Sequence, residues 1–142
     1  MTQAELITLA RQVATSANLY PAVICGMCQR ESSWNPYALR YEPFFYLKYV
    51  APLGLLDPTE AQARGFSWGL MQTMGQVVRE AGYKDNLAML CDPETALIWG
   101  CKVFEGKLAH ADGNVTNALL LWNGGGNPNY AAEVLEFAKA YS

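Results

Sequence analysis

Charged side chains are scarce in this sequence, and the features that mark several functional classes are missing. Only 16% of the residues are charged, and the net charge is −3. This balance lacks the basic surface that binds nucleic acid. No apolar run is long enough to span a membrane, and Met1–Glu5 has neither the basic region nor the apolar core of a secretory signal. We therefore expect no nucleic-acid partner and no membrane anchor. The chain either stays where it is made, leaves by another route, or is part of a longer protein.

Metal-binding side chains are also few. His110 is the only histidine, and the cysteines are Cys25, Cys28, Cys91 and Cys101. On a continuous helix Cys91 and Cys101 would lie about 15 Å apart, too far for a disulfide. A CxxC pair with a second pair ten residues apart is not a usual zinc spacing. We predict free thiols that pack as small apolar residues, with no metal and no cofactor. A four-cysteine zinc module is the alternative.

The alternation of Val, Ile and Thr that marks strands is absent as well. Apolar residues recur instead at helical spacing between helix-start signals such as the capping box Thr2–Glu5 and the pair Asp92–Pro93. No repeat or linker divides the chain, and its length fits one domain. We therefore predict an all-α fold forming a single domain, residues 1–142. The predicted helices span residues 3–17, 21–35, 58–64, 73–80, 93–110, 115–122 and 129–141.

Glu31 stands out in the second predicted helix. The apolar residues that define its buried face are Val23, Ile24, Met27 and Cys28. Glu31 falls on the same face one turn later, just before Asn35–Pro36, which should end the helix. Burial raises the pKa of a carboxyl, as a general acid near neutral pH requires. The alternatives are an exposed glutamate at a helix end, or one paired with Arg30 or Arg40.

Between Pro36 and Pro58 neither helical nor strand spacing is sustained, and aromatic residues are crowded. They are Tyr37, Tyr41, Phe44, Phe45, Tyr46 and Tyr49. So many aromatic rings would be costly in a solvated loop. They either pack on the core or line a groove, where aromatic faces stack on sugar rings.

Four short motifs then occur in an order typical of one enzyme family. They are Glu31-Ser32-Ser33-Trp34-Asn35-Pro36, Gly69-Leu70-Met71-Gln72, Trp122-Asn123-Gly124-Gly125, and Tyr130. On these motifs the chain resembles the lytic transglycosylases, which share a lysozyme-like fold with goose-type lysozymes. The resemblance spans residues 20–138 and implies a helical lysozyme-like domain with a substrate groove.

The resemblance assigns roles to individual residues. Glu31 matches the family's catalytic acid and base. The residues expected to bind substrate are Ser32, Ser67, Gly69, Met71, Gln72, Asn123 and Tyr130. Ser32 either holds Glu31 by a hydrogen bond or only helps to end the helix. The family's usual Ala-Tyr-Asn is replaced by Leu121-Trp122-Asn123, which keeps an aromatic ring but loses a phenol hydroxyl.

The implied activity is a peptidoglycan lytic transglycosylase that cleaves the MurNAc-β-1,4-GlcNAc bond. Glycoside hydrolysis ordinarily uses two carboxylates, whereas here only Glu31 lies in a motif. One carboxyl suffices if the sugar's own 6-hydroxyl closes a 1,6-anhydro ring. A hydrolytic muramidase would need a second carboxylate, and Glu42 is the candidate, because Asp57 and Glu60 are expected to form a capping box. A non-catalytic, wall-binding virion module is a further alternative.

The resemblance also suggests a setting. The long insertion between Asn35 and Ser67 is similar to versions found in bacteriophage cell-wall enzymes. We expect a bacteriolytic, endolysin-like monomer that is made in the cytoplasm and acts on glycan strands of the cell wall in the periplasm. A separate membrane-permeabilising protein would release it.

Overall fold

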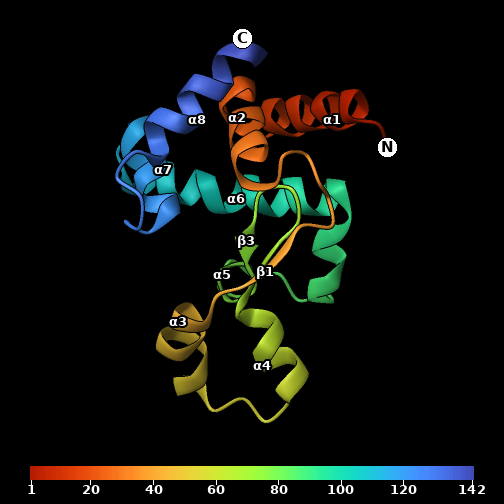
Figure 1. The fold of residues 1–142 in the computed structure, drawn as a ribbon, viewed down its shortest axis with the longest axis vertical. Helices are drawn as coiled ribbons and strands as arrows, with labels where there is room; N and C mark the ends of the chain where they lie inside the picture. Colours follow the sequence, from red (N-terminus) through yellow and green to blue (C-terminus); the bar gives the residue numbers. More distant parts are fainter.

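Helices make up most of the computed structural model, which describes residues 1–142 (Figure 1). The α-helices are α1 Gln3–Ser16, α2 Pro21–Ser32, α3 Pro43–Phe45, α4 Pro58–Arg64, α5 Gly75–Glu80, α6 Pro93–His110, α7 Val115–Asn123 and α8 Tyr130–Ala138. A π-helical turn spans Tyr46–Val50, and 3-10 turns span Ala51–Leu53, Leu87–Cys91 and Lys139–Tyr141. The predicted all-α class is confirmed. None of the helices combines the length and the apolar character needed to cross a membrane.

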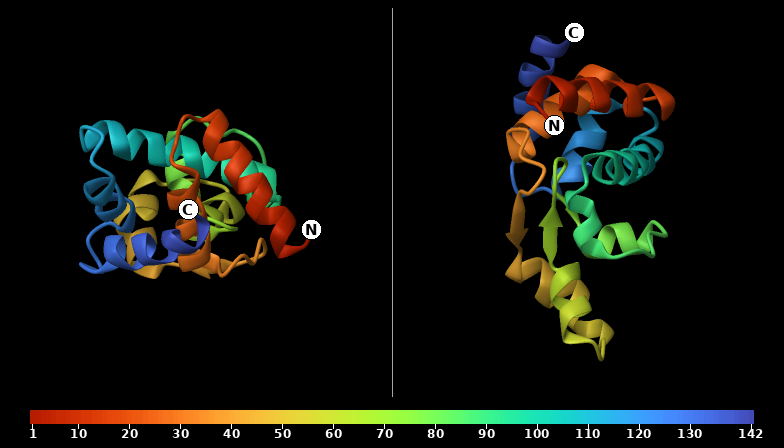
Figure 2. Two further views of the ribbon diagram at one scale, coloured as in Figure 1. Left: turned by 90° about the horizontal axis from the view of Figure 1, so that it is seen from above. Right: turned by 90° about the vertical axis from the view of Figure 1, so that its right-hand side faces the viewer.

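The helices gather into a body from which one lobe extends. Helices α1, α2 and α8 lie together near both termini, and α6 crosses beneath them (Figure 1). The lobe runs from β1 through α3 to α4 and projects away from the body, so the molecule is elongated (Figure 2). This arrangement leaves α2 facing the base of the lobe.

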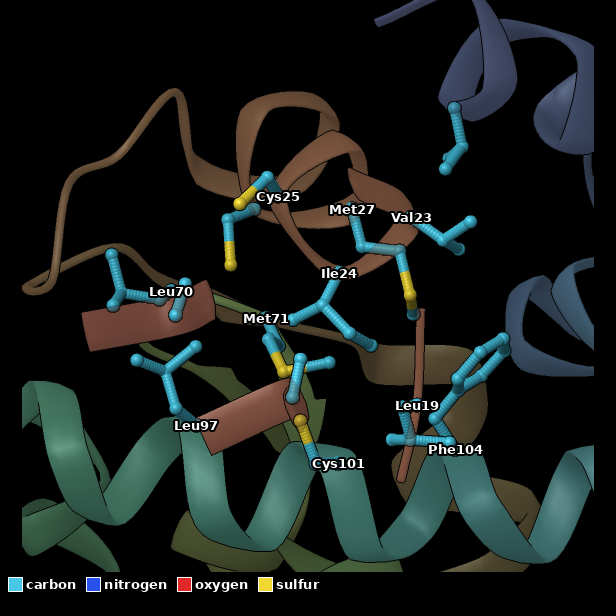
Figure 3. Packing of buried hydrophobic residues seen from close by; sticks show 14 of the residues in the cluster. Leu19, Val23, Ile24, Cys25, Met27, Leu70, Met71, Leu97, Cys101 and Phe104 are labelled. Carbon is cyan, nitrogen blue, oxygen red and sulfur yellow. The ribbon is translucent and has the colours of Figure 1, made fainter. Parts of the chain in front are cut away.

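The main core fills the space between α2, α6 and their neighbours. Ile24 of α2 and Leu97 of α6 point into the same cluster as Met71, and all three are fully buried (Figure 3). Cys25, Cys28 and Cys101 are also buried, as predicted for small apolar residues, whereas Cys91 is only partly buried. All four cysteines are free thiols. The structure has no group of three or more His, Cys, Asp or Glu side chains suited to hold a metal ion.

Side-chain caps set the start of several helices. The Thr2–Glu5 capping box is present, and Asp57 and Asp92 each accept a backbone N–H of the first turn of their helix. The prediction that Glu60 completes the Asp57 capping box is wrong. The Glu60 carboxylate instead pairs with two arginines, Arg64 and Arg79, at 2.9 and 2.7 Å.

Helix α2 ends three residues earlier than the Asn35–Pro36 pair suggests. Ser33 and Trp34 both adopt left-handed backbone conformations, with φ of 49° and 64°. This bend turns the Trp34 side chain into the core, where its Nε1 donates to Tyr141 Oη at 2.9 Å. Glu31 therefore lies on the last turn of α2.

A small antiparallel sheet, which the sequence did not predict, joins the lobe to the body. Its strands are β1 Leu39–Tyr41, β2 Phe66–Trp68 and β3 Thr73–Met74, in the order β1-β2-β3. Ser67 pairs with Arg40 on one side and with Met74 on the other. Strands of two or three residues are too short to show a period-two pattern.

The aromatic residues of the lobe pack on one another or line a groove, and the predicted alternative that they pack on the main core is wrong. Tyr41 packs on Tyr46 and Phe66, with ring centroids 6.0 and 5.2 Å apart. Phe45 and Tyr49 face a cleft instead, with ring centroids 4.9 Å apart. The short helical turns of this segment were not predicted, because no single apolar stripe runs through them.

Candidate active site

A cleft of about 720 Å³ opens between the body and the lobe. Its walls come from α2, the β1–α3 segment, the π-helical turn, β2, β3, α5, α6, α7 and α8. Five of the predicted site residues line this cleft: Glu31, Ser67, Gln72, Asn123 and Tyr130. A volume of this size is typical of a ligand site. The fold thus brings together residues that are up to 99 positions apart in the sequence.

Glu31 lies in the wall of the cleft without an ion pair. The two arginines proposed as partners are engaged elsewhere: Arg30 binds Glu133 at 2.7 Å, and Arg40 binds Glu42 at 3.1 Å. Burial raises the pKa of Glu31 above its ordinary value, and this is the dominant effect. The Tyr130 hydroxyl and the two arginines act in the opposite direction without cancelling it. The direction predicted from the sequence is therefore confirmed.

Tyr130 begins α8 and faces the same part of the cleft. Its side chain is only 2% exposed, and its buried hydroxyl has no hydrogen-bond partner. Burial and the nearby Glu31 charge raise the pKa of the phenol, so the phenol remains protonated. A buried hydroxyl without a partner is costly. In this protein the Tyr130 O–H group is therefore available to donate a hydrogen bond to the neighbouring Glu31 carboxyl.

A close contact between two helices fixes this pair. A Cβ at Gly26 of α2 would come within 2.6 Å of the backbone carbonyl oxygen of Val134 in α8. Only glycine allows the two backbones to approach so closely. Glu31 and Tyr130 therefore stand on two helices whose backbones are in close contact.

The turn after β2 forms the opposite wall. Ser67 Oγ donates to Gln72 Oε1 at 2.8 Å, and Gln72 Nε2 donates to the carbonyl oxygens of Ala38 and Gly69, each at 2.9 Å. Gln72 itself has a left-handed backbone, with φ of 52°. These bonds orient the Gln72 carboxamide and tie β1 to the turn.

Three predicted substrate-binding residues do not line the cleft. Ser32 Oγ lies 2.8 Å from the carbonyl oxygen of Leu70 and 3.0 Å from that of Cys28, so it links α2 to the turn behind the wall. Gly69 is buried against the backbone of Leu90. Met71 is fully buried, so the prediction that its side chain contacts substrate disagrees with the structure. These residues support the wall from behind.

Asn123 and Trp122 close one end of the cleft. With the carboxamide oriented to satisfy its neighbours, Asn123 Oδ1 accepts the N–H groups of Asn127 at 2.7 Å and Gly126 at 3.1 Å. Trp122 lines the cleft while its ring packs edge-on against Phe104, 6.1 Å between centroids. The amide of Asn123 therefore holds the loop after α7 in place.

Several charged residues of the cleft were not predicted as site residues. Lys48 and Lys107 line it without ion pairs, and Glu80 lines it beside Gln76. Glu42, the candidate second carboxylate, lines it as well, whereas Asp57 and Glu60 do not. No local motif surrounds the two lysines, so only the folded chain could bring them to the site.

Comparison with known families agrees with this geometry. The family model described as the transglycosylase SLT domain matches residues 8–141. No curated protein and no solved structure matches the chain. The matched span holds every residue of the cleft and nearly the whole fold. The chain therefore belongs to the transglycosylase SLT domain family.

Proposed function

We propose that this protein is a peptidoglycan lytic transglycosylase in which Glu31 is the single acid and base. Its family supports a glycan-cleaving activity on peptidoglycan. The observation that carries the finer proposal is the state of Glu31, a largely buried carboxyl with a raised pKa and no ion pair, in the wall of a large cleft. A carboxyl in this state can hold a proton near neutral pH and release it to a substrate.

The reaction needs two proton transfers at Glu31, one from the carboxyl to the leaving oxygen and one from the 6-hydroxyl back to the carboxylate. Protonated Glu31 donates to the glycosidic oxygen as the bond from the MurNAc C1 to that oxygen breaks, and the GlcNAc hydroxyl leaves. The N-acetyl group of the muramic acid stabilises the positive charge at C1. The carboxylate of Glu31 then takes the proton of the 6-hydroxyl as its oxygen bonds to C1. The product carries a 1,6-anhydro ring, and no water is consumed.

Tyr130 can assist this exchange. Its hydroxyl meets no acceptor with good hydrogen-bond geometry in the structure, yet it lies near enough to Glu31 to lower the pKa of that carboxyl. Once Glu31 has given up its proton, the phenol can donate a hydrogen bond to the carboxylate. A bond of this kind to a charged group is worth about 1.5–3 kcal/mol.

Hydrolysis by a muramidase mechanism is the second candidate, because Glu42 lines the same cleft. Its carboxylate is held by Arg40 at 3.1 Å. A charged carboxylate across a cleft from the acid can activate water for attack on C1.

The mass of the products distinguishes the two reactions. Purified peptidoglycan is digested, and the released muropeptides are analysed by mass spectrometry for the wild type and for Glu42→Gln. We expect anhydro-muropeptides from both proteins. Products one water heavier that disappear with Glu42→Gln would instead establish hydrolysis. Binding to peptidoglycan without any released product would identify a non-catalytic module.

Tyr130→Phe should separate stability from activity. Removal of a buried hydroxyl without a partner should leave the free energy of unfolding unchanged or slightly increased. Cleavage should slow by roughly tenfold to a hundredfold, since the lost bond stabilises the charged intermediate state of Glu31. The alkaline limb of the pH profile should move to higher pH, because this hydroxyl lowers the pKa of Glu31.

Denaturant unfolding and initial rates of muropeptide release provide the measurements for this variant. Tyr37→Phe is the matched control, since Tyr37 is exposed and lies outside the cleft. A Tyr130→Phe protein with the wild-type rate and wild-type pH profile would show that the phenol does not act on Glu31.

A further inference from the structure

Arg30 lies next to Glu31 in the sequence and lines the same cleft, yet it does not pair with it. Its Nε donates to Glu133 Oε2 at 2.7 Å, and its guanidinium carbon lies 5.7 Å from the centre of the Tyr130 ring. Glu133 is on α8, one turn after Tyr130. The cation nearest to Glu31 in sequence is thus held on the neighbouring helix.

Glu133 is itself fixed in this position. Asn127 Nδ2 donates to the same Oε2 atom at 3.2 Å, and Asn127 belongs to the loop that Asn123 braces. The carboxylate therefore accepts from Arg30 on one side and from the loop on the other. These two hydrogen bonds favour one orientation of the arginine side chain, which is itself 37% exposed.

The arrangement matters because a free guanidinium would compete for Glu31. Arginine and a carboxylate bind strongly when nothing else engages them. Apart from Glu133, the carboxylates to consider are Glu31 on the α2 wall of the cleft and Glu42 on the lobe wall. Arg40 already binds Glu42. Without Glu133, Glu31 would be the open partner nearest to Arg30.

We propose that Glu133 is a positioning residue: its carboxylate holds Arg30 against the Tyr130 ring and so keeps Glu31 free of an ion pair. The consequence for catalysis rests on the proposed function of Glu31 as the acid. Glu133 does not itself line the cleft; it contacts Arg30, which does. It acts through Arg30 alone.

The other groups around Glu31 bear on its protonation as well. Tyr130 faces it from α8, Arg40 from β1 and Glu42 from the segment before α3, and the Cys28 thiol lies one turn back on α2. Arg30 and Arg40 lower the pKa of Glu31, and Glu42 raises it. Of these groups, only Arg30 is held in place by Glu133.

The test compares three proteins: the wild type, Glu133→Ala, and Glu133→Ala combined with Arg30→Ala. The Glu31 carboxyl is titrated by NMR, and the pH profile of peptidoglycan cleavage is recorded alongside. In Glu133→Ala the titration midpoint of Glu31 should fall. The rate on the alkaline limb should drop by roughly tenfold, since a neighbouring opposite charge lowers a carboxyl pKa by about one unit or more. Removal of Arg30 as well should return the midpoint to at least its wild-type position.

Glu136→Ala is the matched control. It removes a carboxylate from the same helix with the same change in net charge, but Glu136 pairs with Lys139 in solvent and is far from Arg30 in its contacts. Its titration and profile should match the wild type. An unchanged Glu31 midpoint in Glu133→Ala, or a lowered one that persists without Arg30, overturns the proposal.

Failure of the proposed function would look different. If the Glu31 midpoint falls in Glu133→Ala but the alkaline limb of the rate does not follow, Glu133 positions Arg30 as proposed, and Glu31 is not the acid. The titration thus tests the positioning role by itself.

Discussion

Replacing Glu31 with glutamine should reduce peptidoglycan cleavage by about a hundredfold or more. Glutamine keeps the shape of the side chain but cannot give or take a proton, and proton transfer by a positioned group contributes roughly 10²–10⁴-fold to a rate. The measurement is the initial rate of muropeptide release from purified peptidoglycan. Glu42→Gln, which removes the candidate second carboxylate on the lobe wall of the cleft, should retain most of the rate if the reaction is a transglycosylation.

The same substitution should increase stability near neutral pH. Burial raises the pKa of Glu31 in the folded protein above its unfolded value. The protonated carboxyl is therefore tolerated at low pH, and stability is lost as the pH rises through the folded pKa. Glutamine avoids this loss, so the stability difference between Glu31→Gln and wild type should grow from acidic to neutral pH.

Denaturant unfolding at several pH values measures this trend. A difference that stays constant with pH would mean that Glu31 is not desolvated in the folded protein. A Glu31→Gln protein that cleaves peptidoglycan at the wild-type rate would rule out Glu31 as the acid, whatever its stability.

Gly69→Ala should cause a large loss of stability for a single added methyl group, although Gly69 lies behind the wall of the cleft. Gly69 has φ of +69°, and an added Cβ would come within 2.2 Å of the backbone carbonyl oxygen of Leu90. The left-handed backbone costs an alanine roughly 1–2 kcal/mol, and overpacking costs about 1–3 kcal/mol more. We therefore expect a loss of about 3 kcal/mol in the free energy of unfolding. The displaced turn should also carry Gln72 out of position and lower activity.

Gly113→Ala isolates the contribution of the backbone. Gly113 has a similar φ of +80°, but an added Cβ there would meet nothing within 4 Å, and the residue lies outside the cleft. The free energy of unfolding of Gly113→Ala should fall only by the cost of the left-handed backbone, about 1–2 kcal/mol. Its activity should be unchanged. If the two variants lost the same free energy of unfolding, the Leu90 backbone would be shown to move away from the added methyl group at no cost in stability.

Most of the helical frame could be predicted because its signals are local. The Thr2 and Asp92 caps act within a single turn, and the apolar stripe of α2 points to Glu31 within one helix. The buried face of that helix also gave the direction of the Glu31 pKa. Such features depend on neighbours three or four residues away, which the sequence displays directly.

The rest depends on contacts between distant segments. Glu133 is 103 positions from Arg30, so no spacing rule could connect them. Met71 was assigned to the substrate from its motif, but the turn directs its side chain into the core. The short strand β3 forms because the fold places Met74 opposite Ser67 of β2. Its sequence does not by itself favour a strand.

The contact at Gly26 has a consequence for how a polymer enters the cleft. Because the backbones of α2 and α8 are in contact there, we expect the two helices to move together and to keep Glu31 beside Tyr130 when a bulky chain enters. We therefore expect the cleft to open on the lobe side, which joins the body through the small sheet and through the Glu60–Arg79 and Arg64–Gln76 contacts with α5. Hydrogen exchange should accordingly be slow at α2 and α8 and faster along the lobe. The sugar chain would then bind between a rigid wall, made by α2 and α8, and a more mobile wall, made by the lobe.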